Sequence, residues 1–338
     1  MAEFRKNIIT GKLCVIASER AKRPKMSRVE ADKVNLNIAH DPNCPFCYGN
    51  ENQTPLEISS YRTDNSQPNT RGWKIRVVPN KYPAFARENE FTQQTDEEFF
   101  EKTYAYGATE IIIESPHHSM NPALFDLAQI ELLITAYIDR IVDLKQDKSI
   151  KYIIPFRNNG KQAGASLAHP HSQLIAIPII PHDLRDELVN SSAYYEEKHK
   201  CVFCELIEQE QKENLRIVAE NAEFIAICPF ASEFSFETWI LPKRHNSKFE
   251  DITKEEKTSF ARIYKQVMTK IYVGLDDIPY NYYIQSSPVQ EECADFYHWS
   301  LRVIPKFSIP AGFELGTNIA INTSIPEDCA DFLKNISV

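Results

Sequence analysis

The chain carries the same ordered set of cysteines and histidines twice. Each copy has a C-x-x-C pair followed by two widely spaced histidines: Cys44, Cys47, His118 and His169 in the first copy, and Cys201, Cys204, His245 and His298 in the second. The two histidines are 51 residues apart in the first copy and 53 in the second. Agreement over such a span is hard to obtain by chance, so the sequence predicts a duplicated folding unit.

The segments between these residues also correspond. Strands are expected over 110–114 and 237–241, and in each copy a histidine lies eight residues after the leading glutamate. Apolar residues at helical spacing predict helices over 126–147 and 253–275, the second opened by a capping box from Thr253 to Glu256. The other expected strands cover 152–156, 174–177, 282–285 and 301–304. This order predicts an α+β fold in which antiparallel sheets carry helices packed on one face.

We expect two halves, 1–190 and 191–338, each built around one copy. The stretch 179–200 is mostly polar and contains a proline, so it is interpreted as the connection between the halves. The charged stretch 205–214 is expected to form a short solvated helix.

Composition narrows the class of protein. The net charge of −9 and the pI near 5.6 argue against a non-specific nucleic-acid binder. No apolar run is long enough to span a bilayer and the N-terminus lacks a signal-peptide pattern, so we expect a soluble cytoplasmic protein. Only 9 glycines are present and no long glycine loop appears, so phosphate would be held by side chains and local backbone.

The paired cysteines are interpreted as metal ligands. The x-x spacing lets one tight turn aim both thiolates at one ion. A redox pair needs the motif at the head of a helix after a strand, whereas the residues around Cys44 and Cys47 resemble a loop. Scattered cysteines elsewhere are interpreted as small buried hydrophobic residues.

Each copy supplies a Cys2His2 set suited to tetrahedral zinc. A single histidine would more often be an ordinary core or surface residue, but the repeated ligand order favours metal at both sets. His117 is an alternative to His118, and the match with His245 favours His118. Four protein ligands leave no open position, so we expect two structural zinc ions per chain.

His171 lies two residues after His169 and is left free of metal. A neutral imidazole can attack phosphorus when its other nitrogen donates to a backbone carbonyl. Gln173, on the same face of the expected strand, can donate its amide to a phosphoryl oxygen. In the second copy Ser300 replaces His171, so one active site per chain is expected.

Residues upstream of His171 are candidates for binding a diphosphate. Asn158, Gly164, Ala165 and Ser166 lie in a stretch where small residues let backbone N–H groups approach an anion. Arg20 and Arg23 are spaced for a phosphate clamp, although a solvated basic turn is the alternative interpretation.

These motifs resemble the galactose-1-phosphate uridylyltransferase family, a branch of the histidine triad superfamily. The resemblance covers nearly the whole chain and rests on the following segments: 10–12, 20–24, Cys44-Pro45-Phe46-Cys47, 115–119, 158–173, 236–238, 242–245 and Gly312-Phe313-Glu314. It implies a duplicated histidine-triad-like unit, a homodimer, and a nucleotide sugar and a hexose 1-phosphate as substrates. From the charge and the apolar runs, no nucleic-acid or membrane partner is expected.

The resemblance also implies roles for individual residues. His171 becomes nucleotidylated, and Gln173 and Ser166 contact the transferred phosphate. The residues implied to hold the nucleotide are Arg20, Arg23, Asn80, Lys81 and Asn158. Phe313 and Glu314 match positions that contact the hexose, usually from the partner subunit.

The sequence departs from the family pattern at two places. Glu187 could match a glutamate that holds a second metal in some bacterial members, but the strand after His298 lacks the other ligands. Ser308 stands where a lysine is expected before Gly312, with Lys306 nearby. The layout is closer to the two-zinc branch that includes ADP-glucose phosphorylase.

Three hypotheses follow. The first is transfer of UMP between UDP-glucose and galactose 1-phosphate by double displacement through His171. The second is ADP-glucose phosphorylase activity, with adenylyl transfer to phosphate. The third is a zinc-stabilised nucleotide-binding scaffold without turnover, against which the co-occurrence of His171, Gln173 and Ser166 argues.

Overall fold

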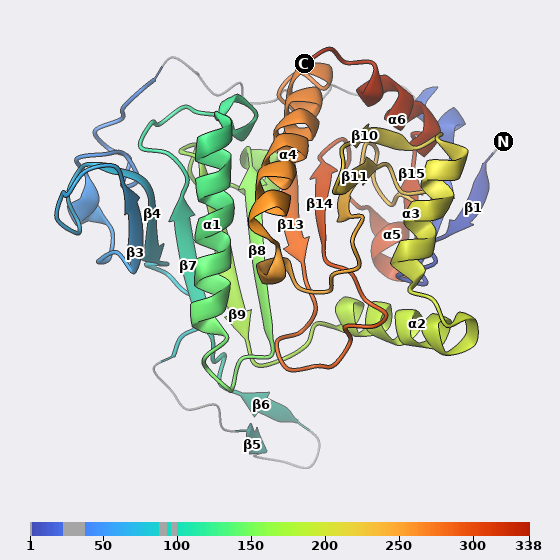
Figure 1. Ribbon diagram of the computed structural model, residues 1–338, viewed down its shortest axis with the longest axis horizontal. Coiled ribbons are helices and arrows are strands. Elements are labelled where there is room, and N and C mark those ends of the chain that lie inside the picture. The colour runs from blue at the N-terminus through green and yellow to red at the C-terminus, as the bar shows by residue number, and fades with distance from the viewer. Residues whose placement is uncertain (1, 23–37, 88–92, 96–99) are drawn as a thin grey trace.

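The protein is described by a computed structural model that covers residues 2–22, 38–87, 93–95 and 100–338. A ten-stranded sheet forms its centre (Figure 1). Every pair of neighbouring strands in it is antiparallel. The strands in spatial order are β10 (Ile217–Glu220), β11 (Phe224–Ile227), β12 (Thr238–Pro242), β14 (Ser300–Pro305), β13 (Tyr280–Gln285), β8 (Tyr152–Asn159), β9 (His171–Ile177), β7 (Ala108–Ile113), β4 (Trp73–Pro79) and β3 (Ser59–Arg62).

The order of this sheet is symmetric about the junction of β8 and β13. Five strands of the first half and five of the second join there, with Tyr282 opposite Arg157 in the ladder. The two expected antiparallel units therefore form one continuous sheet. Two small sheets accompany it: β1 (Glu3–Lys6), β2 (Leu13–Ile16) and β15 (Ala320–Asn322) in one, and β5 (Gln93–Thr95) and β6 (Glu101–Thr103) in the other.

Helices α1 (Leu127–Leu144) and α4 (Lys254–Gly274) lie side by side across one face of the sheet (Figure 1). Asp126 caps α1 by accepting from the backbone N–H of Gln129, and α4 begins with the expected capping box of Thr253 and Glu256. The largest apolar cluster fills the layer between these helices and the sheet. The helix face therefore supplies most of the core, which leaves the opposite face for the functional groups.

The opposite face is covered over the second half by α2 (His182–Lys198) and α3 (Val202–Glu213). The expected connection over 179–200 thus contains a helix. Its buried apolar residues include Leu184 and Leu188, four positions apart, in an otherwise polar stretch. This stripe is too narrow to stand out in the sequence. The helix expected over 205–214 begins earlier, because Cys201 is its N-cap residue.

The remaining helical segments are short. They are α5 (Gly312–Thr317), α6 (Pro326–Lys334) and the 3-10 turns η1 (Ser18–Lys22), η2 (Glu51–Gln53), η3 (Pro122–Leu124), η4 (Lys161–Ala163) and η5 (Phe249–Asp251). Within the described residues, no helix combines the length and apolar character needed to cross a membrane.

Candidate active site and metal centres

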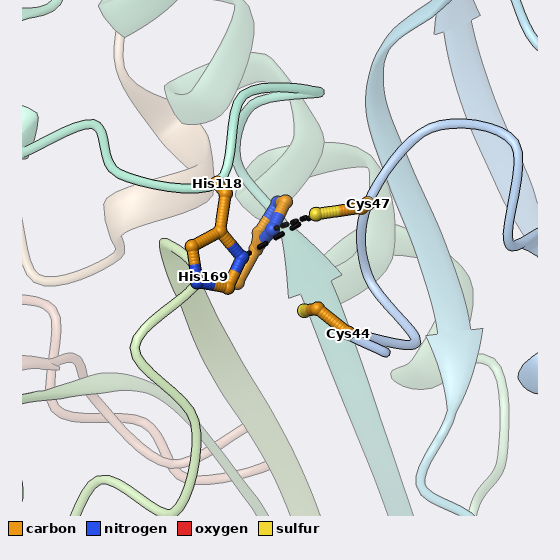
Figure 2. A group of neighbouring side chains, drawn as sticks. All are labelled: Cys44, Cys47, His118 and His169. Atoms are coloured by element: carbon orange, nitrogen blue, oxygen red, sulfur yellow. Dashed lines mark hydrogen bonds between the residues drawn. The ribbon is translucent and has the colours of Figure 1, made fainter. Parts of the chain in front are cut away.

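The first Cys2His2 set converges at one point on the sheet face opposite α1 (Figure 2). Cys47 Sγ lies 3.3 Å from His118 Nδ1 and 3.6 Å from His169 Nδ1. All four potential ligand atoms, including Cys44 Sγ, are within 4.8 Å of one another. His118 follows β7 and His169 precedes β9, so the adjacent ends of these two strands bring both rings to the C-x-x-C turn.

Backbone contacts orient this set for a metal. His169 Nε2 lies 2.8 Å from the carbonyl oxygen of Ser115, which can only accept, so Nε2 carries the hydrogen and Nδ1 presents a lone pair. Burial lowers the pKa of His169 to about 3, which keeps the ring neutral. A tetrahedral zinc with bonds of about 2.0–2.3 Å separates its ligand atoms by roughly 3.3–3.8 Å. The distances from Cys47 fit that geometry, whereas His117 is exposed and outside the set.

The second Cys2His2 set converges in the same way at the start of α3. Cys204 Sγ lies 3.4 Å from His245 Nδ1 and 3.3 Å from His298 Nε2. His245 Nε2 contacts the carbonyl oxygen of Ala294, so its Nδ1 is the nitrogen free to bind. Cys201, the fourth member of the set, is a free cysteine like Cys204. A thiolate is the metal-binding form of cysteine, so this set also suits zinc.

His171 is the first residue of β9 and has a different partner from His169. Its Nδ1 lies 2.8 Å from the carbonyl oxygen of His169, so Nδ1 carries the hydrogen and Nε2 keeps the lone pair. Burial lowers the pKa of His171 to about 4, so the imidazole is neutral near pH 7. Phe46 packs against the ring in a T-shaped arrangement, with centroids 5.2 Å apart. The arrangement leaves Nε2 as the one ring nitrogen available to react.

A pocket of about 710 Å³ opens at His171. Five residues expected at the site line it: Asn80, Lys81, Ser166, His171 and Gln173. The sequence reasoning missed Pro45 and Phe46, which lie between two metal ligands, and the polar run Asn52–Pro55. For Pro45 and Phe46, the one sequence signal of a place at the pocket was their position between two expected metal ligands. Residues 52–55 carry no motif that would have indicated a place at the pocket.

Other expected site residues within the described chain do not line this pocket. Asn158 accepts a hydrogen bond of 2.8 Å from Asn281 in the neighbouring strand, and Gly164 has a left-handed backbone with φ of 87° beside it. Ala165 N–H donates to the Gly160 carbonyl at 3.2 Å. The exposed members of this group are Arg20 in η1 and Phe313 in α5.

Glu314 accepts from the backbone N–H of Ala311 at 3.1 Å and so stabilises the start of α5. Arg23 lies outside the described residues.

An ion pair that the sequence did not reveal lies behind His171 on the helix-covered face. Arg157 of β8 pairs with Glu114, which follows β7, and also donates to the carbonyl oxygen of His171 at 3.3 Å. Both charged side chains are almost completely buried. The hydroxyl of Tyr137 adds a hydrogen bond of 2.7 Å to Ser172. Hydrogen bonds from the helix-covered face therefore hold the first two residues of β9, His171 and Ser172, in place.

The second half has no histidine at the position that corresponds to His171, and an ion pair lies nearby. Ser300 stands in place of His171, and Arg302 makes a bidentate ion pair with Glu187 at 2.7 and 2.9 Å. Gln285 donates to the same carboxylate at 2.7 Å. Glu187 is thus held by a guanidinium group, and it belongs to neither Cys2His2 set.

Comparison with known proteins connects this geometry to one family. Residues 1–181 match the N-terminal domain, and residues 187–309 the C-terminal domain, of galactose-1-phosphate uridyl transferase. An ADP-glucose phosphorylase of Arabidopsis thaliana is 35% identical, with 99% of this chain and 93% of the relative covered. A galactose-1-phosphate uridylyltransferase of Thermotoga maritima is 31% identical, with 100% and 99% covered.

Solved structures agree with these matches. The crystal structure of the ADP-glucose phosphorylase of Arabidopsis thaliana with bound ADP-glucose superposes with a TM-score of 0.85 at 33% identity, over 100% of both chains. A uridylyltransferase structure superposes with a TM-score of 0.75 at 26% identity, covering 99% of this chain and 97% of the other.

Proposed function

Because the chain belongs to the galactose-1-phosphate uridylyltransferase family, we propose that it transfers a nucleoside monophosphate through a covalent adduct on His171. The observation that carries this proposal is the hydrogen bond from His171 Nδ1 to the His169 carbonyl. It fixes the tautomer in which Nε2 holds its lone pair at a pocket large enough for a nucleotide.

The reaction consists of two in-line displacements at the same phosphorus. His171 Nε2 attacks the phosphorus that bears the nucleoside, and the bond to the sugar phosphate breaks, releasing a hexose 1-phosphate. The acceptor phosphate then attacks the same phosphorus and displaces the imidazole. Gln173 and Ser166 line the pocket beside His171, where an amide or hydroxyl donor can stabilise charge on the phosphoryl oxygens.

We propose that zinc binds both Cys2His2 sets. With four protein ligands, zinc supplies a structural cross-link and leaves no open position for Lewis-acid chemistry. In the first half His169 is a ligand while its carbonyl accepts from His171, so metal binding and orientation of the nucleophile depend on the same residue. Cys44, Cys47 and His118 complete that site.

The proposed reaction is UMP transfer between UDP-glucose and galactose 1-phosphate in the cytoplasm. Uridylyltransferase relatives that align with the full chain support it. The family resemblance at Phe313 and Glu314 supports a homodimer whose partner subunit completes the sugar site, since neither residue lines the pocket at His171 in its own chain.

A second candidate is phosphorolysis of ADP-glucose. It is favoured by the relative that is 35% identical and by the similar structure that contains ADP-glucose. In sequence, Ser308 stands where the uridylyltransferase pattern has a lysine.

Four reactions separate the candidates: purified protein with UDP-glucose or ADP-glucose, each with galactose 1-phosphate or inorganic phosphate. UDP-galactose formation supports the first candidate, and release of ADP from ADP-glucose with phosphate supports the second. A metal-loaded, folded protein that is inactive in all four and forms no adduct on His171 would instead support the scaffold hypothesis.

A further inference from the structure

Four polar side chains lie together on the helix-covered side of the sheet, next to the main chain of His171. Glu114 pairs with Arg157, and the hydroxyl of Tyr137 donates to Ser172 at 2.7 Å. All four side chains are buried, and the layer around them is the large apolar cluster between the sheet and helices α1 and α4. Stability alone does not explain a charged pair in such a layer, because apolar residues of similar volume are often at least as favourable.

The charged pair holds the main chain on both sides of the proposed nucleophile. Arg157 Nη1 donates to the carbonyl oxygen of His171 at 3.3 Å. The backbone N–H of Glu114 donates to the carbonyl oxygen of Pro170, one residue earlier, at 3.0 Å. Arg157 Nη2 also donates to Asn159 Oδ1 at 3.1 Å, at the end of β8. The two carbonyl groups that flank His171 are therefore bound by the two members of one ion pair.

The second half shows how the same positions are built where the nucleophile is absent. Ser172 lies three residues after the last histidine of its Cys2His2 set, and Leu301 lies three residues after that of the second set. In the ladders, Ile112 of β7 pairs with Ser172, and Ile240 of β12 pairs with Leu301. Leu301 is therefore the counterpart of Ser172, and Ile240 is the counterpart of Ile112.

The same ladders assign counterparts to the ion pair. Glu114 lies two residues beyond the β7 partner of the serine, and Pro242 lies two residues beyond the β12 partner of the leucine. Ile284 of β13 pairs with Leu301, and Arg157 stands at the equivalent place in β8, one residue beyond the end of its ladder with β9. Pro242, Ile284 and Leu301 are all buried. The fold thus accommodates apolar side chains at all three places.

One tyrosine is common to both halves. Tyr137 of α1 and Tyr264 of α4 each lie 19 residues after the first histidine of their set. The hydroxyl of Tyr264 is buried and has no hydrogen-bond partner among the described residues, whereas that of Tyr137 bonds to Ser172. The connected polar network therefore occurs only in the half that contains His171, although the fold of the other half is built without it.

We propose that Glu114 and Arg157 are positioning residues, which hold the main chain of His171 so that Nε2 lies in line with the phosphorus under attack. This inference rests on the proposed nucleotidyl transfer and deepens it. Neither residue lines the pocket at His171, so their effect passes through the backbone and not through contact with substrate. Misplacement of a reacting group by about 1 Å can cost roughly a hundredfold in rate.

The test is the single-turnover rate of adduct formation on His171, with whichever of UDP-glucose and ADP-glucose labels the wild-type protein. Glu114→Gln breaks the ion pair with little change in side-chain size. Glu110→Gln is the matched control, because Glu110 is also buried and makes a bidentate pair with Arg140 of α1. We expect Glu114→Gln to lower the maximal rate at least about tenfold, with half-saturating concentration and metal content unchanged, and Glu110→Gln to react at the wild-type rate.

A charge-free variant separates positioning from stability. Glu114→Leu/Arg157→Met leaves no uncompensated ion, so it should be more stable than Glu114→Gln and provides the test if that variant fails to fold. It should still form the adduct at least about tenfold more slowly than the wild-type protein, because the His171 carbonyl has lost its donor. Glu110→Leu/Arg140→Met, which removes the neighbouring buried pair, should react at the wild-type rate.

The outcomes distinguish this inference from the proposed function. The inference is overturned if folded, metal-loaded Glu114→Gln or Glu114→Leu/Arg157→Met forms the adduct at the wild-type rate. It is also overturned if the Glu110 variants slow the reaction equally, or if only the half-saturating concentration changes. A wild-type protein that forms no adduct overturns the proposed function, and this inference with it.

Discussion

Two histidines separated by one residue have opposite ring orientations because their main-chain acceptors differ. His169 directs Nε2 to the Ser115 carbonyl and leaves Nδ1 for the Cys2His2 set. His171 directs Nδ1 to the carbonyl of His169 and leaves Nε2 free. A carbonyl oxygen can only accept, so the backbone fixes each tautomer and with it the role of each ring.

This contrast predicts that the two alanine variants separate chemistry from metal binding. His171→Ala should lose turnover and adduct formation while retaining the metal content of the wild-type protein. His169→Ala should lose about half of the bound metal, because it lacks one of four ligands at one of two sites. Metal analysis beside an activity assay checks this, with the exposed His117→Ala as control. Loss of metal from His171→Ala would contradict the assignment.

The buried ion pair behind His171 predicts a stability effect. Glu114→Gln removes the partner of Arg157 and leaves a buried guanidinium uncompensated, which should lower the free energy of unfolding by about 3–5 kcal/mol. Urea unfolding measures the change. Glu197→Gln breaks the exposed pair with Lys198 and should leave the unfolding midpoint unchanged. Equal midpoints for both variants would argue against a structural role for the buried pair.

At the scale of elements, the sequence predicted the helices that have a capping motif or regularly spaced apolar residues. The capping box at Thr253 and the apolar spacing of α1 predicted both sheet-covering helices. Helix α2 was missed because its apolar stripe is narrow and its burial is decided by packing against the sheet.

The candidate site likewise has features that the sequence reveals and features that depend on tertiary contacts. The repeated Cys2His2 spacing and the His-Pro-His sequence are patterns that the sequence itself displays, so the convergence of each set and the position of His171 beside the first could be predicted from it. The pairing of Arg157 with Glu114 depends on three strands meeting side by side. It has no signature in a single segment of chain.

The capping box itself predicts a measurable contribution from one element. Thr253→Ala removes the side-chain acceptor for the Glu256 N–H and should lower the free energy of unfolding by about 1 kcal/mol. Thr258→Ala lies within the same helix, where alanine has the higher helix propensity, and should not destabilise the protein. Denaturant titration of both variants checks the prediction. Equal loss from both changes would assign the effect to the helix interior and not to the cap.

At the scale of the whole molecule, one sheet joins two halves that have diverged in chemistry. Both halves keep a Cys2His2 set, but the first has His171 at its pocket, whereas the second has Ser300 at that position and the Arg302–Glu187 ion pair two residues further on. Under the proposed function, the first half carries the reacting histidine and the second half does not.

This division predicts the effect of metal removal. The folded chain should contain two zinc ions, and a strong chelator should lower its thermal stability, because structural zinc sites in small domains contribute about 10–16 kcal/mol apparent. Cys201→Ser should lower stability and halve the metal content while adduct formation on His171 continues. Metal analysis, thermal unfolding and mass spectrometry test these outcomes, and one ion or none in folded wild-type protein would contradict them.

The proposed homodimer can be tested separately. A homodimer is expected at assay concentration, with Phe313 and Glu314 reaching the sugar site of the partner subunit. Phe313→Ala should then raise KM for the hexose 1-phosphate more than it changes adduct formation, and light scattering should report a dimer. Full activity from a monomer would contradict this arrangement.

The most direct measurement of the central claim is the mass of His171 after reaction with one substrate alone. The protein is incubated with UDP-glucose or ADP-glucose, quenched in base and digested. The account predicts an increase of one nucleoside monophosphate on the peptide that contains His171, with ping-pong kinetics, and the size of the increase identifies the base. An adduct on another residue, or intersecting-line kinetics without an adduct, would contradict it.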